Sequence, residues 1–315
     1  MWQKLLGLPI DVSAHGARID QLLLWVHVLM AVLFVGWIAL FFYILVRFRR
    51  GRQPKADYTG VTTHASSYVE AIVAVVEVAL LVGISIPFWS WKVNAAATPD
   101  AAAIRIRVTA QQFAWNVHYP GADGIFGRTD IKLCNEQTNP IGLDRDGDPQ
   151  AKDDIVTVNQ LHIPVNKPVI IDLTTKDVIH SFSLPVLRVK QDTIPGMTIP
   201  VAFTATQTSD QIRDQLTRTL KLPADKKLEG LIAMADYADA SGNSLVKKGK
   251  GVTDAVAKKL ADAGVPEIQV GPRYSAEIAC AQLCGLGHYR MKGFLNIDDE
   301  KQYKAWMQDE LDALQ

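Results

Sequence analysis

The stretch Cys280-Ala-Gln-Leu-Cys284-Gly-Leu-Gly-His288-Tyr-Arg-Met291 brings two thiols, an imidazole and a thioether together in one short segment. Soft sulfur ligands with histidine suit copper much better than magnesium or calcium. Zinc also binds Cys and His in tetrahedral sites, but Met is a poor zinc ligand, so the set favours copper. A single Cys would suggest one blue-copper ion. Two cysteines allow two thiolates to bridge two ions, and the stretch therefore predicts a copper site with two metals.

A second histidine is needed to complete such a site, and His180 is the best candidate. It ends the strand-like run 169–177, which is rich in β-branched residues, and it directly precedes Ser181. A single histidine is usually an ordinary hydrogen-bonded residue, and His162 keeps that interpretation. For His180, its surroundings favour a ligand instead.

Further motifs carry a family resemblance. Residues 177–185, DVIHSFSLP, resemble the first CuA ligand loop of cytochrome c oxidase subunit II, and 190–196, KQDTIPG, continue that pattern. The cysteine stretch is similar to the second ligand loop of this family, and residues 112–120, QFAWNVHYP, to its aromatic stretch. The resemblance covers nearly the whole chain except residues 204–271. It implies an all-β, cupredoxin-like sandwich with a binuclear CuA centre.

The resemblance also implies a ligand for each metal position. In the family pattern Cys280 and Cys284 bridge both copper ions. His180 and Met291 complete one copper, and His288 and the backbone carbonyl of Gln282 complete the other. Electrons would arrive from a c-type cytochrome and leave to haem in the catalytic subunit of a proton-translocating haem-copper oxidase. No catalytic residue is expected on this chain, because oxygen is reduced on the neighbouring subunit.

Three departures from the family pattern change what is expected. Phe113 stands where the family usually has Trp, at the patch that, with Trp115, is associated with the arrival of electrons. Gln282 stands where the family commonly has Glu, whose side chain helps to bind a magnesium ion at the boundary with the catalytic subunit. Residues 204–271 have no counterpart in the core pattern of the family.

Two apolar runs upstream predict a membrane anchor. Residues 21–46 contain no charged side chain and can span about 30 Å of hydrocarbon as a helix. Residues 68–91 are similar in length but include Glu70 and Glu77, which fall on one helix face. Acids inside membrane helices often face protein and mark proton pathways. Because Glu70 also has a similar position in the family at a proton-channel entrance, it is a candidate for proton uptake.

The connection between the two runs indicates their orientation. Arginines follow the first run at once, which argues against a cleaved signal peptide there. The positive-inside rule places this basic connection in the cytoplasm. Both termini and the extramembrane part are then expected on the periplasmic side of the inner (plasma) membrane. The basic residues of the connection are Arg47, Arg49, Arg50, Arg52 and Lys55.

These patterns divide the chain into an anchor over residues 1–92 and an extramembrane CuA domain over residues 93–315. An Ala-rich linker, 94–103, leads into short β-type runs separated by turns, which predict a sandwich. The insertion at about 204–271 reads as a small α/β unit. Its expected elements are a helix at 212–220, a turn at 240–243, an amphipathic helix at 252–263 and a strand at 267–270.

Charge and composition limit the classes of molecule that the chain is expected to bind. The 315 residues hold 33 basic and 33 acidic side chains, a balance that gives no argument for nucleic acid. Membrane lipid and other oxidase subunits are the expected partners. One alternative attaches the same copper module to a membrane nitric oxide reductase; two anchoring helices argue against the soluble nitrous oxide enzyme. A thioredoxin-fold copper chaperone is disfavoured, because here His180 precedes the two cysteines and Met291 follows them, which is the wrong order for that class. A quinol oxidase subunit that has lost copper is also disfavoured, because this chain retains all five side-chain ligands.

Overall fold

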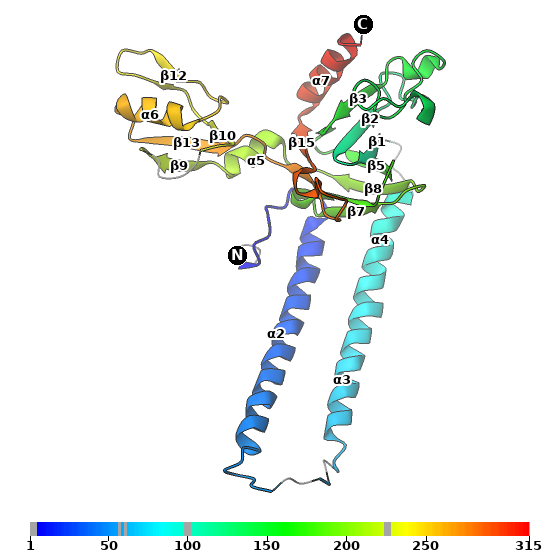
Figure 1. Cartoon of the computed structure of the whole chain (residues 1–315), viewed down its shortest axis with the longest axis vertical. Helices are drawn as coiled ribbons and strands as arrows, with labels where there is room; N and C mark the ends of the chain where they lie inside the picture. Colours follow the sequence, from blue (N-terminus) through cyan, green and yellow to red (C-terminus); the bar gives the residue numbers. More distant parts are fainter. Residues whose placement is uncertain (1–4, 56–57, 60–61, 98–101, 224–227, 315) are drawn as a thin grey trace. The chain divides into compact units, whose positions relative to one another are not determined.

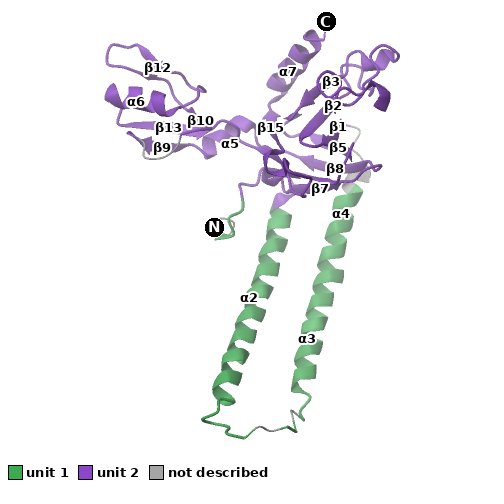
Figure 2. Cartoon of the chain, viewed as in Figure 1, with its two compact units in different colours: residues 1–8, 17–98 green, residues 9–16, 99–315 purple. Residues whose placement is uncertain are grey.

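The computed structural model describes residues 5–55, 58–59, 62–97, 102–223 and 228–314. Part of the expected linker, residues 98–101, lies outside this set. The chain forms two compact units, residues 1–8 with 17–98 and residues 9–16 with 99–315 (Figure 2). The sequence assigned residues 1–92 to the anchor as one piece, whereas residues 9–16 are grouped with the second unit.

Two long apolar helices make up most of the first unit (Figure 1). The first is α2, Gly16–Arg47. The second spans Ala65–Asn94 and is long and apolar enough to cross a membrane, as is α2. It consists of α3 (Ala65–Leu80), a π-helical stretch (Leu81–Ser85) and α4 (Ile86–Ala97). Both helices begin before the predicted apolar runs, because the flanking polar residues continue the helical backbone into the expected headgroup region.

The second unit is built around two five-stranded sheets, in the orders β3-β2-β1-β5-β8 and β4-β15-β14-β6-β7. β1 pairs with β5 in parallel and β4 with β15 in parallel, and the other neighbours are antiparallel. The strands of the first sheet are β1 (Ile104–Gln111), β2 (Ala114–Tyr119), β3 (Ile155–Val158), β5 (Pro168–Thr175) and β8 (Ile199–Thr204). Those of the second sheet are β4 (Gln160–Pro164), β6 (His180–Leu184), β7 (Val189–Thr193), β14 (Glu277–Cys280) and β15 (Lys292–Asp298).

One continuous core joins the two sheets. Alternate residues of β1 are buried, as expected when one face of a strand packs against another layer. Trp115 of the first sheet is completely buried, and its ring lies 5.4 Å from that of Phe182 in the second sheet. Inward-facing residues of β4, β5, β14 and β15 belong to the same cluster. The predicted β-sandwich is therefore confirmed.

The segment 9–16 completes this unit at one edge. The Val12 side chain is only 1% exposed, and its backbone N–H donates to the Val186 carbonyl at 2.9 Å. The Ala14 N–H donates to the Thr204 carbonyl at 3.0 Å. The apolar run of the first helix gave no indication that the preceding residues would pack with strands far along the chain.

A smaller cluster of elements follows β8. It has its own sheet, β10-β13-β9, a two-stranded ribbon, β11-β12, and a separate core around Leu260 and Val270. The predicted helix 212–220 is wrong in its second half, because that segment leaves the helix to pair with a distant strand. The elements are α5 (Ser209–Gln215), β9 (Arg218–Lys221), β10 (Leu231–Ala233), β11 (Tyr237–Ala238), β12 (Ser244–Val246), α6 (Asp254–Asp262) and β13 (Glu267–Pro272).

Short helical turns and one terminal helix complete the chain. The helix α7 (Glu300–Asp312) follows β15 and begins with a capping box between Asp299 and Gln302. Trp306 of this helix stacks on the His162 ring of β4 at 4.2 Å. His162 thus has a structural role, as expected. The 3-10 turns are η2 (Ile131–Leu133), η3 (Pro149–Ala151), η4 (Pro185–Leu187) and η5 (His288–Arg290).

Candidate metal centre

Two neighbouring strands position the cysteine stretch. Cys280 is the last residue of β14, and Met291 directly precedes β15, which pairs with β14. The segment between them is therefore a loop that leaves the sheet and returns beside its own start. The Cys280 N–H donates to the Met291 carbonyl at 3.4 Å and closes the base of this loop. Two ligand candidates distant in the loop are thus held close together.

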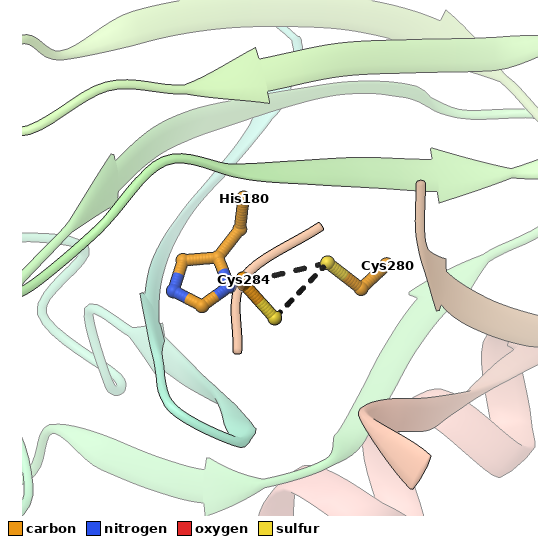
Figure 3. Close-up of side chains that lie close together, drawn as sticks. All are labelled: His180, Cys280 and Cys284. Atoms are coloured by element: carbon orange, nitrogen blue, oxygen red, sulfur yellow. Dashed lines mark hydrogen bonds between the residues drawn. The ribbon is translucent and has the colours of Figure 1, made fainter. Parts of the chain in front are cut away.

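The next strand of the same sheet brings in the predicted histidine. His180 begins β6, which pairs with β14 so that Cys280 lies opposite Phe182. The ligand atoms of His180, Cys280 and Cys284 all lie within 4.8 Å of one another and could hold a metal ion (Figure 3). Residues about a hundred positions apart in the chain therefore meet because their strands are neighbours.

Each thiol sulfur has two further donor atoms close to it, and the four distances are similar. The Cys280 Sγ lies 3.9 Å from the His180 Nδ1 and 3.2 Å from the Gln282 carbonyl oxygen. The Cys284 Sγ lies 3.6 Å from the His288 Nδ1 and 3.7 Å from the Met291 Sδ. Metal–ligand bonds of about 2.0–2.3 Å in tetrahedral sites place two donors on one ion roughly 3.5 Å apart. The four donor atoms each lie within 3.9 Å of a thiol sulfur, a spacing that ligands of one ion would need, and the six-residue ligand set stays a prediction.

The two thiols are not joined to each other. Their sulfur atoms are 3.9 Å apart, whereas a disulfide needs about 2.05 Å. Both cysteines are free, and Cys284 is buried while Cys280 is half-buried. Two thiols, two imidazoles, a thioether and a carbonyl form a soft donor set, which fits copper.

A carboxylate fixes the orientation of His180. The His180 Nε2 lies 2.8 Å from the Asp177 Oδ1, so the other ring nitrogen faces the thiols. Burial raises the pKa of Asp177, but hydrogen bonds from His180, Gln112 and Val178 outweigh it and hold this pKa below its ordinary value. A carboxylate behind a ligand histidine sets the ring orientation and increases the basicity of the coordinating nitrogen.

Electrostatics keep the buried thiol protonated in the absence of a metal. Burial, together with the adjacent Cys280, raises the pKa of Cys284 to about 11. A metal must therefore displace a proton from this thiol, because the thiolate is the form that binds metal.

The remaining predicted residues lie in different places. Phe113 is half-buried above the cysteine loop, where a Cβ on Gly287 would collide with its ring. Trp115 is fully buried, 6.2 Å from the His180 ring, so it cannot itself contact an electron donor. Glu70 lies on α3, at a distance along the chain from the thiols, and its part in proton uptake stays a prediction.

Sequence reasoning missed two residues that support the ligands, Asp177 and Gln112. The Gln112 backbone N–H donates to the Asp177 Oδ2 at 2.7 Å, and its side-chain Nε2 donates to the Cys284 carbonyl at 2.5 Å. Both residues lie inside the quoted family motifs. Their position there was the available signal, but the contacts arise only when β1, β6 and β14 assemble.

Residues 104–212 match the family model described as cytochrome c oxidase subunit II, periplasmic domain. A protein named alternative cytochrome c oxidase subunit 2, from Bradyrhizobium diazoefficiens, is 28% identical over 214 residues, which cover 68% of this chain and 53% of that protein. Cytochrome c oxidase subunit 2 of Cereibacter sphaeroides is 28% identical over 211 residues, 63% of this chain and 66% of that protein. The chain thus spans about half to two thirds of the length of these relatives. The predicted resemblance is confirmed.

The chain also has a low similarity to a solved structure. The crystal structure of the periplasmic domain of subunit II of cytochrome oxidase from Bradyrhizobium japonicum has 19% sequence identity and a TM-score of 0.35. The match covers 69% of this chain and all of that domain. The family model ends at residue 212, before the cysteine loop, so the second half of the ligand set lies beyond the matched range.

Replacing either clustered cysteine should reduce metal binding. We expect Cys280→Ser and Cys284→Ser to hold fewer copper ions per chain than the unchanged protein, because a hydroxyl is a poor ligand for a soft metal. The matched control is Cys134→Ser, which changes an exposed cysteine outside the cluster. Elemental analysis after gel filtration of the copper-loaded chain measures the effect. Full copper content in Cys280→Ser would contradict the ligand assignment.

Proposed function

We propose that this chain, whose residues 104–212 match the periplasmic domain of cytochrome c oxidase subunit II, is the electron-accepting subunit of a respiratory haem-copper oxidase. The observation that carries the proposal is the convergence of two unpaired thiols with two imidazoles, a thioether and a carbonyl. The names of the relatives favour an oxidase over a nitric oxide reductase.

The donor set is proposed to hold two copper ions in a CuA centre. Cys280 and Cys284 would bridge the ions, with His180 and Met291 as further ligands of one copper and His288 and the Gln282 carbonyl of the other. When bound there, a copper pair would supply one-electron transfer with little reorganisation. Because Gln282 lacks a carboxylate, the family's magnesium site at the subunit boundary should be weakened. Metal analysis of the complex and its Gln282→Glu variant tests this point.

The protein groups around the site support rapid electron transfer in a fixed geometry. His180 is completely buried, and Cys284 and Met291 are only 3% and 2% exposed. Asp177 holds the His180 ring from behind, so this ligand need not turn when the charge of the centre changes. Burial keeps water from these three side chains, whereas Cys280 and His288 are half-buried and Gln282 is exposed. Together these features favour a site that accepts and passes on an electron with little movement.

The ligand loops expose apolar side chains that fit a protein partner. Leu283, Leu286 and Tyr289 on the cysteine loop are 77%, 98% and 85% exposed. Exposed apolar residues that gather at one place mark interaction surfaces. We propose that the centre receives electrons from a c-type cytochrome and passes them to haem in the catalytic subunit. That subunit would reduce oxygen to water and translocate protons.

The two apolar helices would tether the copper domain to the inner membrane, in contact with lipid and with the other oxidase subunits. The basic residues between the helices favour a cytoplasmic connection. Residues before α2 and the whole copper domain would then lie on the periplasmic side. Neither the balanced charge nor the site suggests a role with nucleic acid.

Removing one thiol should abolish electron entry from the cytochrome but leave the reduction of oxygen at the haem intact. In the assembled complex, we expect Cys284→Ser to lower oxidation of a reduced c-type cytochrome to about one hundredth or less, in the range seen when an essential group is removed. Oxygen consumption driven by a small reductant that reaches haem directly should persist. The Cys134→Ser complex should keep both activities. Normal cytochrome oxidation by Cys284→Ser, with haem content intact, would rule out this route for electrons.

Thiol labelling in spheroplasts tests the orientation. The exposed native Cys134 should react with a membrane-impermeant maleimide, because its domain lies outside. Tyr58 lies between the helices and is 94% exposed. In a Cys134→Ser background, Tyr58→Cys should react only after the membrane is permeabilised. The reverse pattern would place the connection outside and invert the proposed topology.

A further inference from the structure

We propose that Gln112 is a positioning residue that links the two ligand loops of the metal centre to each other. The inference rests on the proposed copper function and concerns a residue with no ligand atom in the cluster. Gln112 makes one hydrogen bond to each ligand loop, one with its backbone and one with its side chain. It can therefore set the distance between the loops without touching a metal.

The local backbone explains why Gln112 reaches both loops. Strands β1 and β2 pair up to Gln111 opposite Ala114, so Gln112 and Phe113 form the two-residue turn between them. This turn projects from the end of the first sheet toward the ligand loops of the second sheet, as the hydrogen bonds of Gln112 show. A residue at the tip of a tight hairpin has a well-defined backbone direction. The turn thus presents Gln112 from a rigid element.

A short chain of hydrogen bonds runs through Gln112 from one ligand to another. The His180 Nε2 lies 2.8 Å from one oxygen of Asp177, and the Gln112 N–H donates to the other oxygen at 2.7 Å. The Gln112 Nε2 donates to the carbonyl of Cys284 at 2.5 Å. His180 on the first loop and Cys284 on the second are therefore connected through the Asp177 carboxylate and through the backbone N–H and side-chain amide of Gln112.

Close packing supports the same role. A Cβ added to Gly285 would lie 2.7 Å from the Gln112 Nε2, and one added to Gly287 would collide with the Phe113 ring. The Arg290 guanidinium lies 5.8 Å from the centre of that ring. The cysteine loop therefore fits directly against the β1–β2 turn, and the two glycines are what allow this approach.

The side-chain link can be removed without disturbing the rest of the turn. Gln112 is largely exposed apart from its amide contact, so Gln112→Leu should not damage the core. Its backbone N–H still reaches Asp177 in this variant. Gln111→Leu is a matched control one residue away, because the Gln111 side chain accepts a hydrogen bond from Asn116 at 3.0 Å. Within the part of the chain that the structure describes, Gln111 makes no side-chain hydrogen bond to either ligand loop.

The experiment compares the two variants in the full chain, in detergent and in a Cys134→Ser background. For Gln112→Leu we expect copper release to a chelator to become about tenfold faster, the usual effect of losing a group that supports a ligand. The optical spectrum and reduction potential of the copper-loaded chain should also change. In the metal-free, reduced chain, alkylation of Cys280 and Cys284 by iodoacetamide should become several-fold faster, as the loop loses its support. Gln111→Leu should match the unchanged protein in copper release, optical spectrum, reduction potential and alkylation rate.

Three results would overturn the inference. The first is wild-type copper release, spectrum and alkylation in Gln112→Leu. The second is an equal change in Gln111→Leu, and the third is an equal fall in unfolding temperature in both metal-free variants. Either of the last two would indicate general damage to the turn. If the unchanged chain lacks a two-copper spectrum, the proposed function fails. The alkylation rates then still decide whether Gln112 holds the cysteine loop.

Discussion

The structure depends on holding two thiols 3.9 Å apart without a bond between them. Left unrestrained, two free thiols could come close enough for an oxidant to join them in a disulfide, or separate beyond the reach of shared metals. Cys280 is fixed because it ends a strand that pairs on both sides, with β6 and β15. Cys284 is fixed by burial and by the hydrogen bond from Gln112 to its carbonyl. The β-sandwich thus fixes the distance between the two sulfur atoms.

This constraint explains why the ligands come from so few elements. A loop between paired strands returns to its start, so one loop supplies both thiols, His288 and Met291. The adjacent strand β6 supplies His180 from the other side. Hydrogen bonds between Asp177 and His180 and from Gln112 to Cys284 then restrict how far His180 and Cys284 can move. The proposed copper site therefore depends on the β-topology, since neither loop alone contains the complete proposed donor set.

The sequence predicted those features that short patterns encode. The apolar runs 21–46 and 68–91 and the spacing from Cys280 to Met291 each depend on nearby residues, and they predicted the helices and the ligand loop. Long-range pairing was not accessible in this way. Residues 218–220 read as helix because of their periodicity, yet they pair with β13 some fifty residues later. Val12 and Gln112 likewise acquire their contacts from turns and loops far along the chain.

The most direct test of the account is the copper content and electron-spin-resonance spectrum of the full chain after loading with copper. Two thiolates bridging two ions predict two coppers per chain and one unpaired electron that is shared equally by both nuclei. The chain should also be purple, as expected for a mixed-valence pair. A spectrum from a single isolated copper, or tight zinc binding with no copper colour, would contradict the central claim.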